Sequence, residues 1–288
     1  MKTLKHITDE LDPANSEAFI LMAKIHKEKG NFSEANINLE LALSYNLKIR
    51  EKALFHLLNG ILQRHQGDVE SSVNSLKNAL SLNTGAEKLN DQDLASLYIE
   101  LSSCYKELNQ FRNAKECLSE AAEIFEKSKF EPLFIMSNAD LALLQNNVAT
   151  ALSVLASITA DQPHFINAQM KMAEIHLKYN KDGHMYAECY RQLAKQEGTA
   201  ESFVRLADAY LTIQEPEKAV ESYERAVKLS ADPEFALRSA RVLVKHISML
   251  RLSNDTGSQE RLAVSNWVCF LLNWVNFKQQ KNCLANIP

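Results

Sequence analysis

The sequence predicts an all-α protein built from stacked pairs of helices. Apolar residues recur with the 3.6-residue period of an amphipathic helix, in segments that come two by two. A small residue opens the second segment of each pair, at intervals of 32–42 residues. The 288 residues include only 7 Gly and 6 Pro, whereas Ala, Leu, Glu and Lys are plentiful. This composition favours helix throughout and leaves little turn chemistry for an all-β fold.

The pair over residues 201–230 shows the pattern most clearly. One face of its first helix carries Phe203, Leu206, Ala207 and Tyr210. One face of its second helix carries Ala219, Tyr223 and Ala226. Pro216 suits the first turn of the second helix, where a missing N–H costs nothing, and Pro233 ends the pair. The small residues let the two helices approach closely, and the two tyrosines fill the space around them.

Five further pairs precede this one in the same register. The repeat-defining positions of their first helices hold Phe19, Met22, Ala23 and His26; Asn59, Gly60 and Gln63; Tyr98, Leu101, Ser102 and Tyr105; Ile135, Ala139 and Ala142; and Met172, Ala173 and His176. The six second helices open with Ala35, Ser72, Ala114, Ala151, Ala187 and Ala219. Polar insertions are expected between pairs at 84–91 and inside the fifth pair at 181–183.

This pattern resembles the tetratricopeptide repeat, a two-helix unit of about 34 residues. The resemblance implies a right-handed superhelical solenoid, because one pair cannot bury its apolar face without neighbours. We expect about six helix pairs and a partial seventh over residues 1–250. A non-repeat tail over 251–288 contains an apolar helix with Trp267, Phe270, Trp274 and Phe277 on one arc. The tail could cap the solenoid, remain disordered or aggregate, or bind a membrane surface.

Two stretches resemble the tetratricopeptide repeat protein 21 family more specifically than the generic repeat does. They run from Ala168 to Leu177 and from Asp208 to Ala219 (DAYLTIQEPEKA), within a similarity that covers about 18–237. The resemblance implies a scaffold subunit of intraflagellar transport complex A that acts in retrograde transport and cilium assembly. It also implies a cytoplasmic location, at the cilium and its base. Members of the family are much longer, so the chain is expected to be a fragment or a truncated isoform.

Charge and motif content disfavour several other classes of protein. A net charge of −4 and a pI near 6.1 give no electrostatic footprint for nucleic acid or anionic membrane. The apolar stretch of the tail is too short and too often interrupted by Asn to span a bilayer. Five scattered Cys form no CxxC pair, and His176, His184 and Cys189 are not expected to converge on a metal. We expect no cofactor and no enzymatic activity.

A second stripe beside the apolar face is predicted to line the partner-binding groove. In the later pairs each stripe is spaced i, i+4, i+7 and carries an acidic residue beside a leucine. These trios are Met136, Asp140 and Leu143; Met170, Glu174 and Leu177; and Val204, Asp208 and Leu211. In the first three pairs Lys27, Arg64 and Lys106 replace the leucine. The stripe could also be an ordinary solvated face.

Two protein-binding functions remain open. The chain could be a scaffold for other transport-complex subunits, or a cochaperone or adaptor that binds a peptide segment in the groove. Cochaperones of this fold grip a terminal carboxylate with polar residues at set places. One of those places is apolar in every pair here, at Ile20, Leu57, Ile99, Met136, Met170 and Val204. This argues against a carboxylate clamp.

Overall fold

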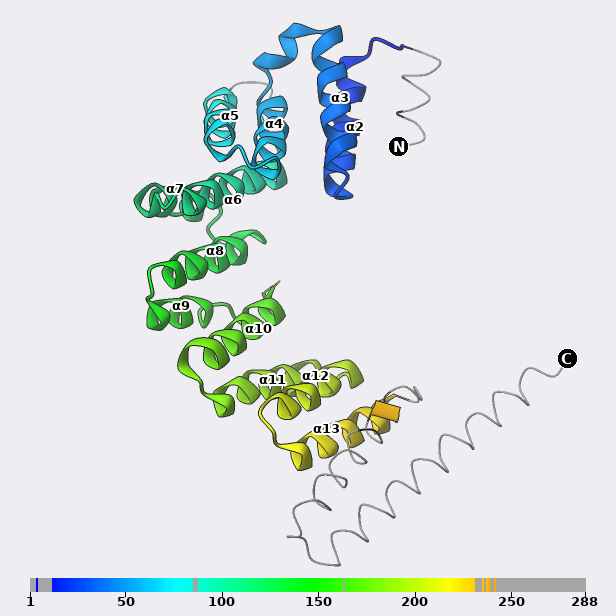
Figure 1. The fold of residues 1–288 in the computed structure, drawn as a ribbon, viewed down its shortest axis with the longest axis vertical. Coiled ribbons are helices and arrows are strands. Elements are labelled where there is room, and N and C mark those ends of the chain that lie inside the picture. Colours follow the sequence, from blue (N-terminus) through cyan, green and yellow to red (C-terminus); the bar gives the residue numbers. More distant parts are fainter. Residues whose placement is uncertain are drawn as a thin grey trace, which may run out of the picture. The chain divides into compact units, whose positions relative to one another are not determined.

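The structure is a computed structural model that describes residues 4, 12–84, 88–162, 164–230, 235, 237, 238 and 241. These residues form helices and connecting turns, with no β-strand among them. The chain divides into two compact units. The first unit runs to Ile158 and includes Gln162–His164, and the second comprises Thr159–Asp161 and the chain from Phe165 onward. The expected all-α repeat fold is confirmed (Figure 1).

The helices occur in consecutive pairs, called repeats 1 to 6 below. In the first unit they are α2 (Ser16–Glu28), α3 (Phe32–Tyr45), α4 (Ala53–His65), α5 (Val69–Leu82), α6 (Asp91–Glu107), α7 (Phe111–Ile124), α8 (Glu131–Leu144) and α9 (Val148–Leu155). A 3-10 helix, η2 (Leu47–Glu51), joins the first two repeats. In the second unit they are α10 (Phe165–Ile175), α11 (Gly183–Glu197), α12 (Ala200–Thr212) and α13 (Pro216–Leu229).

Each repeat closes around the small residue that opens its second helix. Exposed fractions are 0–4% for Ala35, Ser72, Ala114, Ala151, Ala187 and Ala219. In repeat 2 the first helix carries Gly60 at this contact, and a Cβ added there would lie only 2.7 Å from Cγ of Leu76. The Ser72 hydroxyl donates to the carbonyl of Gly60 at 2.7 Å and so satisfies a buried polar group.

Local sequence signals determine where the helices begin and where the chain turns. Side chains that cap helix N-termini accept from a backbone N–H three residues later, at Asn15, Asp68, Asn90, Asn147, Asp182 and Thr199. The turns between paired helices contain a residue with positive φ, at Gly30, Gly67, Asn109, Asn146, Lys181 and Gln214. Gly and Asn tolerate this conformation most easily, so four of the six turns follow the usual preference.

Repeat 5 departs from the others where its first helix ends. After α10 the chain forms a π-helical segment, η3 (His176–Asn180), before Lys181 turns with φ 54°. This segment and the turn accommodate the insertion expected at 181–183. The expected partial seventh pair and the tail over 251–288 lie outside the described residues, apart from four positions between 235 and 241.

Candidate protein-binding face

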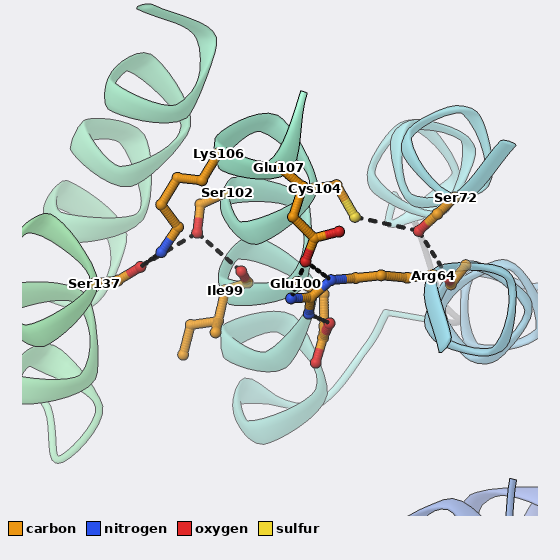
Figure 2. A network of polar contacts seen from close by, with 10 residues as sticks. Arg64, Ser72, Ile99, Glu100, Ser102, Cys104, Lys106, Glu107 and Ser137 are labelled. Carbon is orange, nitrogen blue, oxygen red and sulfur yellow. Dashed lines mark hydrogen bonds and ion pairs between the residues drawn. The ribbon is translucent and has the colours of Figure 1, made fainter. Parts of the chain in front are cut away.

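In the first unit the first helices pack in series, α2 on α4, α4 on α6 and α6 on α8. Polar side chains link them across this surface. Arg64 on α4 donates from Nη1 to Oε2 of Glu100 at 2.5 Å and from Nη2 to Oε1 of Glu107 at 2.7 Å (Figure 2). Burial lowers the pKa of Arg64, but the hydrogen bonds to both carboxylates outweigh that effect and raise it above its ordinary value. Arg64 therefore donates its hydrogen bonds to residues of the same chain and links repeat 2 to repeat 3.

The next link joins repeats 3 and 4. Lys106 on α6 donates from Nζ to Oγ of Ser137 on α8 at 3.0 Å. The hydroxyl of Ser102 lies 3.4 Å from the same oxygen and donates to the carbonyl of Ile99 (Figure 2). Two of the three cations predicted to face a partner thus form contacts between neighbouring repeats. The third, Lys27, is half-buried on α2.

A third link spans a longer distance in the chain. Lys24 on α2 donates from Nζ to Oδ2 of Asp93 on α6 at 2.6 Å. The pair joins repeats 1 and 3, and its side chains are only 20% and 10% exposed. Exposed ion pairs contribute only about 0–1 kcal/mol, whereas removal of one partner from a buried pair is strongly destabilising because it leaves a charge uncompensated.

The predicted acidic trios fall in both units, one in the first and two in the second. On α8 of the first unit, Met136, Asp140 and Leu143 are all half-buried. On the second unit, Met170 is 38% exposed and Glu174 forms an exposed ion pair with Lys178 at 2.9 Å. Leu177 lies in the π-helical segment rather than on α10.

The last trio on α12 is divided between the interior and the surface. Val204 is 4% exposed and belongs to a hydrophobic cluster formed by α11, α12 and α13, so it contributes almost no accessible area. Leu211 is half-buried. Asp208 is exposed, and its carboxylate accepts a hydrogen bond from the hydroxyl of Tyr223 on α13. The acidic side chain therefore also stabilises the pairing of α12 with α13.

Sequence reasoning missed the acceptors of the three links, Asp93, Glu100, Glu107 and Ser137. A signal existed for the first link, since Arg64 precedes Glu100 by about one repeat length. The helical period assigned Arg64 and Lys106 to the surface that faces a partner. It could not show that they contact the next repeat, because the period describes only the faces of a single helix. The described residues bring together no three His, Cys, Asp or Glu side chains that could hold a metal ion.

Two family patterns match different parts of the chain. The pattern described as "Tetratricopeptide repeat protein 21 ARM repeat" matches residues 47–193, slightly more than half of the sequence. The chain belongs to the tetratricopeptide repeat protein 21 family. The generic tetratricopeptide repeat matches residues 200–233, which include α12 and α13.

Named relatives from this family are similar along most of the chain. Tetratricopeptide repeat protein 21B of Xenopus laevis is 33% identical over 270 residues, which cover 90% of this chain and 21% of the relative. The Homo sapiens protein of that name is 32% identical over 274 residues, which cover 91% and 21%. The chain thus spans about a fifth of the length of the curated relatives it matches.

Solved structures support the repeat fold at low sequence identity. Pseudomonas aeruginosa pilF superposes with a TM-score of 0.50 and 16% identity, over 80% of this chain and 98% of that one. The human IFIT1 dimer structure gives a TM-score of 0.53 and 19% identity, over 80% and 58%. At these identities the likeness concerns the fold alone. Among the described helices, none has both the length and the apolar character needed to cross a bilayer.

Proposed function

We propose that this chain is a non-enzymatic scaffold of intraflagellar transport complex A, acting in retrograde ciliary transport and cilium assembly. The observation that carries the proposal is the family match over residues 47–193. Stacked pairs of helices offer an extended surface for binding other proteins. The proposed location is the cytoplasm, the cilium and its base, with other subunits of the complex as partners.

The binding surface proposed is the face of the first helices that carries the acidic trios. Met170 and Glu174 on α10 and Asp208 on α12 are exposed, and half-buried apolar residues lie beside them at Leu177 and Leu211. In the first unit, Met136, Asp140 and Leu143 offer a similar half-buried surface on α8. Carboxylates beside apolar side chains suit a basic, partly apolar helix or strand. Lys27, Arg64 and Lys106 mark the corresponding positions in the earlier repeats.

The test removes the negative charges without removing acceptors that the fold needs. The variant Asp140→Asn/Glu174→Gln/Asp208→Asn keeps an oxygen at each position, including the one that accepts from Tyr223. A matched control, Glu116→Gln/Glu123→Gln/Glu221→Gln, removes three exposed carboxylates from second helices. Both variants should keep the helical content and thermal midpoint of the parent chain.

The tagged chain and both variants are then used for affinity capture from ciliated cells, with quantitative mass spectrometry. Subunits of the transport complex should be enriched by the parent chain and by the control. The acidic variant should recover several-fold less at low ionic strength, with a smaller difference in high salt. Equal recovery by all three chains would exclude the acidic residues, and absence of these subunits from the parent capture would overturn the proposed complex.

The same capture examines the alternative, a cochaperone or adaptor that holds a peptide. Chaperones would then be recovered in place of transport subunits. The apolar positions that argued against a carboxylate clamp include Ile20, Leu57 and Val204, which are 3%, 2% and 4% exposed. Buried aliphatic side chains offer no donor to a terminal carboxylate, so this arrangement supports the scaffold reading.

A further inference from the structure

A groove lies on the second unit, where residues of α11, α12 and α13 line it (Figure 1). Its volume is about 670 Å³, which is within the range of sites that enclose a small ligand or a few side chains of a peptide. The lining residues of α12 are buried or half-buried and form the floor, whereas α11 and α13 carry exposed residues and form the two rims. No residue of the acidic trios lines this groove, so it is separate from the face proposed above.

The floor of the groove is apolar. Leu206 and Tyr210 are 5% and 9% exposed, while Phe203 and Ile213 are half-buried and so offer accessible area. Phe203 and Ile213 are ten positions apart, which corresponds to about 15 Å along a helix. An extended peptide covers that distance with about five residues. The floor therefore offers two apolar contacts to one short segment.

Basic side chains line both rims of the groove. They are Arg191 and Lys195 on α11 and Lys218 and Arg225 on α13, and all are exposed. The hydrogen bond to Glu215 raises the pKa of Lys218, and the positive charge of Arg191 acts against this increase. Arg191 and Lys218 are therefore close enough to repel each other across the groove, and an anionic occupant would reduce this repulsion.

Carboxylates only partly balance these cations. Arg191 forms an ion pair with Glu188, and Lys218 forms one with Glu215 at 2.8 Å. A third carboxylate, Glu221, is exposed on α13. The lining thus contains four Lys or Arg and three Glu, which leaves a positive excess when histidine is neutral.

The cations without acidic partners lie at the end of the groove where α11 leads into α12. Lys195 is in the last turn of α11, and Phe203 is in the first turn of α12. Arg225 on α13 places its guanidinium carbon 6.0 Å from the centre of the Phe203 ring. Neither Lys195 nor Arg225 forms an ion pair with another residue that the structure describes. An aromatic ring with a cation on each rim therefore marks this end of the groove.

Repeat 3 carries a different pair at two equivalent positions. Relative to the small residue that opens the second helix, Tyr98 and Glu120 occupy the places of Phe203 and Arg225. Tyr98 is 1% exposed and donates its hydroxyl to Oε1 of Glu120 at 2.8 Å, so its ring is already covered. Phe203 is half-buried and has a cation beside it in place of a carboxylate. Repeat 6 thus presents an open, basic site where repeat 3 presents a closed, acidic one.

We propose that this groove binds a short acidic segment of a partner protein, with an apolar side chain on Phe203 and a carboxylate between Lys195 and Arg225. A carboxylate at this place gains charge-assisted hydrogen bonds from both rims. A second apolar side chain, about five residues along the segment, reaches Ile213. Exposed charges contribute more to association rate and specificity than to affinity, so the complex is weak and sensitive to salt.

Fluorescence anisotropy with the purified chain and synthetic peptides measures this binding without any subunit of the proposed complex. The acidic probe carries aspartates around a phenylalanine and a leucine that are about five residues apart, and the neutral probe has asparagines in place of the aspartates. The parent chain should bind the acidic probe with a Kd below about 100 μM and the neutral probe at least about tenfold more weakly. Absence of saturable binding would overturn the proposal, whether the groove is empty or covered by another copy or part of this chain. Equal binding of the two probes would also overturn it.

Charge reversal and crosslinking locate the site. Lys195→Glu/Arg225→Glu should weaken binding of the acidic probe by at least about tenfold. Lys181→Glu/Lys228→Glu makes the same change of charge at exposed positions outside the groove and should bind like the parent, with equal helical content in both variants. On the parent chain, an acidic probe with a photoreactive group at its phenylalanine should label the tryptic peptide 196–205, which contains Phe203. Labelling confined to other helices, or equal binding by the two variants, would overturn the proposal.

Discussion

Lys24 on α2 of repeat 1 and Asp93 on α6 of repeat 3 form an ion pair of 2.6 Å, although the whole of repeat 2 separates them in the chain. Most contacts in a repeat protein join nearest neighbours, so stability is close to a sum over adjacent pairs. An ion pair between repeats 1 and 3 therefore adds a contribution to stability that does not come from adjacent repeats. Because both side chains are largely buried, loss of either partner leaves a charge with little access to water.

Asp93→Asn should lower the free energy of unfolding by about 1–3 kcal/mol, since it removes a charge-assisted hydrogen bond to Lys24. Asp93 also lies in the first turn of α6, where any carboxylate interacts with the helix dipole. Asp91→Asn is the control, because Asp91 is exposed in the same turn. Urea denaturation of both variants separates the two effects. Equal losses would mean that the ion pair itself contributes nothing.

Gly60→Ala should destabilise repeat 2 even though alanine is the better helix former. The added Cβ would lie 2.7 Å from Cγ and 2.9 Å from Cδ2 of Leu76, and 3.3 Å from the carbonyl oxygen of Ser72. Overpacking of this kind costs about 1–3 kcal/mol. The double variant with Leu76→Val should lose less than the sum of the single variants, because the two changes share one space. Strict additivity in thermal or urea unfolding would show that Gly60 and Leu76 are not in contact.

Helical period and the spacing of small residues were sufficient to predict the fold. Each of the six small residues predicted to open a second helix is buried, because the close approach of paired helices depends on local sequence that every repeat carries. The sequence predicted an insertion at 181–183 but could not predict that residues His176–Asn180 form a π-helical segment. Extra residues can be accommodated in the turn between two helices or as a π-helical segment at the end of a helix. Which of these two structures forms depends on packing against α11.

The candidate face was predicted less well than the fold. Exposure at Glu174 and Asp208 agrees with a solvent-facing stripe, whereas Val204 on the same stripe is buried. Arg64 pairs with Glu100 and Glu107 of the next repeat. A stripe on one helix is defined by period, but its exposure depends on how closely the next repeat packs. How closely two repeats pack is a property of tertiary structure, and the spacing of residues within one repeat does not determine it.

Removal of the two acidic side chains of the second unit should have unequal effects on stability. Asp208→Ala takes an acceptor away from Tyr223, whose side chain is 2% exposed, so it should cost about 1–3 kcal/mol. Glu174→Ala removes an exposed pair with Lys178 and should change the unfolding midpoint much less. Asp208→Asn should restore most of the loss, because an amide oxygen can still accept from the hydroxyl. Similar midpoints for Asp208→Ala and Glu174→Ala would contradict the contact.

The repeat cores should make the protein sensitive to alkaline conditions. Burial raises the pKa of the Cys117 thiol from 9.0 to about 12 and that of Cys189 to about 11. Burial also raises the pKa of Tyr98 and Tyr223, reinforced by hydrogen bonds to Glu120 and Asp208. The folded protein therefore keeps protons that the unfolded chain releases. Stability should be constant with respect to these groups below about pH 9 and should decrease as pH rises from there toward 12.

Urea denaturation at about pH 8 and about pH 11, in the presence of a reductant, measures this decrease. Cys117→Ala/Cys189→Ala removes two of the groups and should show a smaller loss of stability between the two pH values, even though it starts from a less stable state. Substitution of an exposed serine, Ser153→Ala, should leave the loss unchanged. If the cysteine variant loses as much stability between the two pH values as the parent chain does, the two thiols do not contribute to the pH dependence of stability. Faster alkylation of the same thiols in urea than in buffer would independently show that the fold protects them.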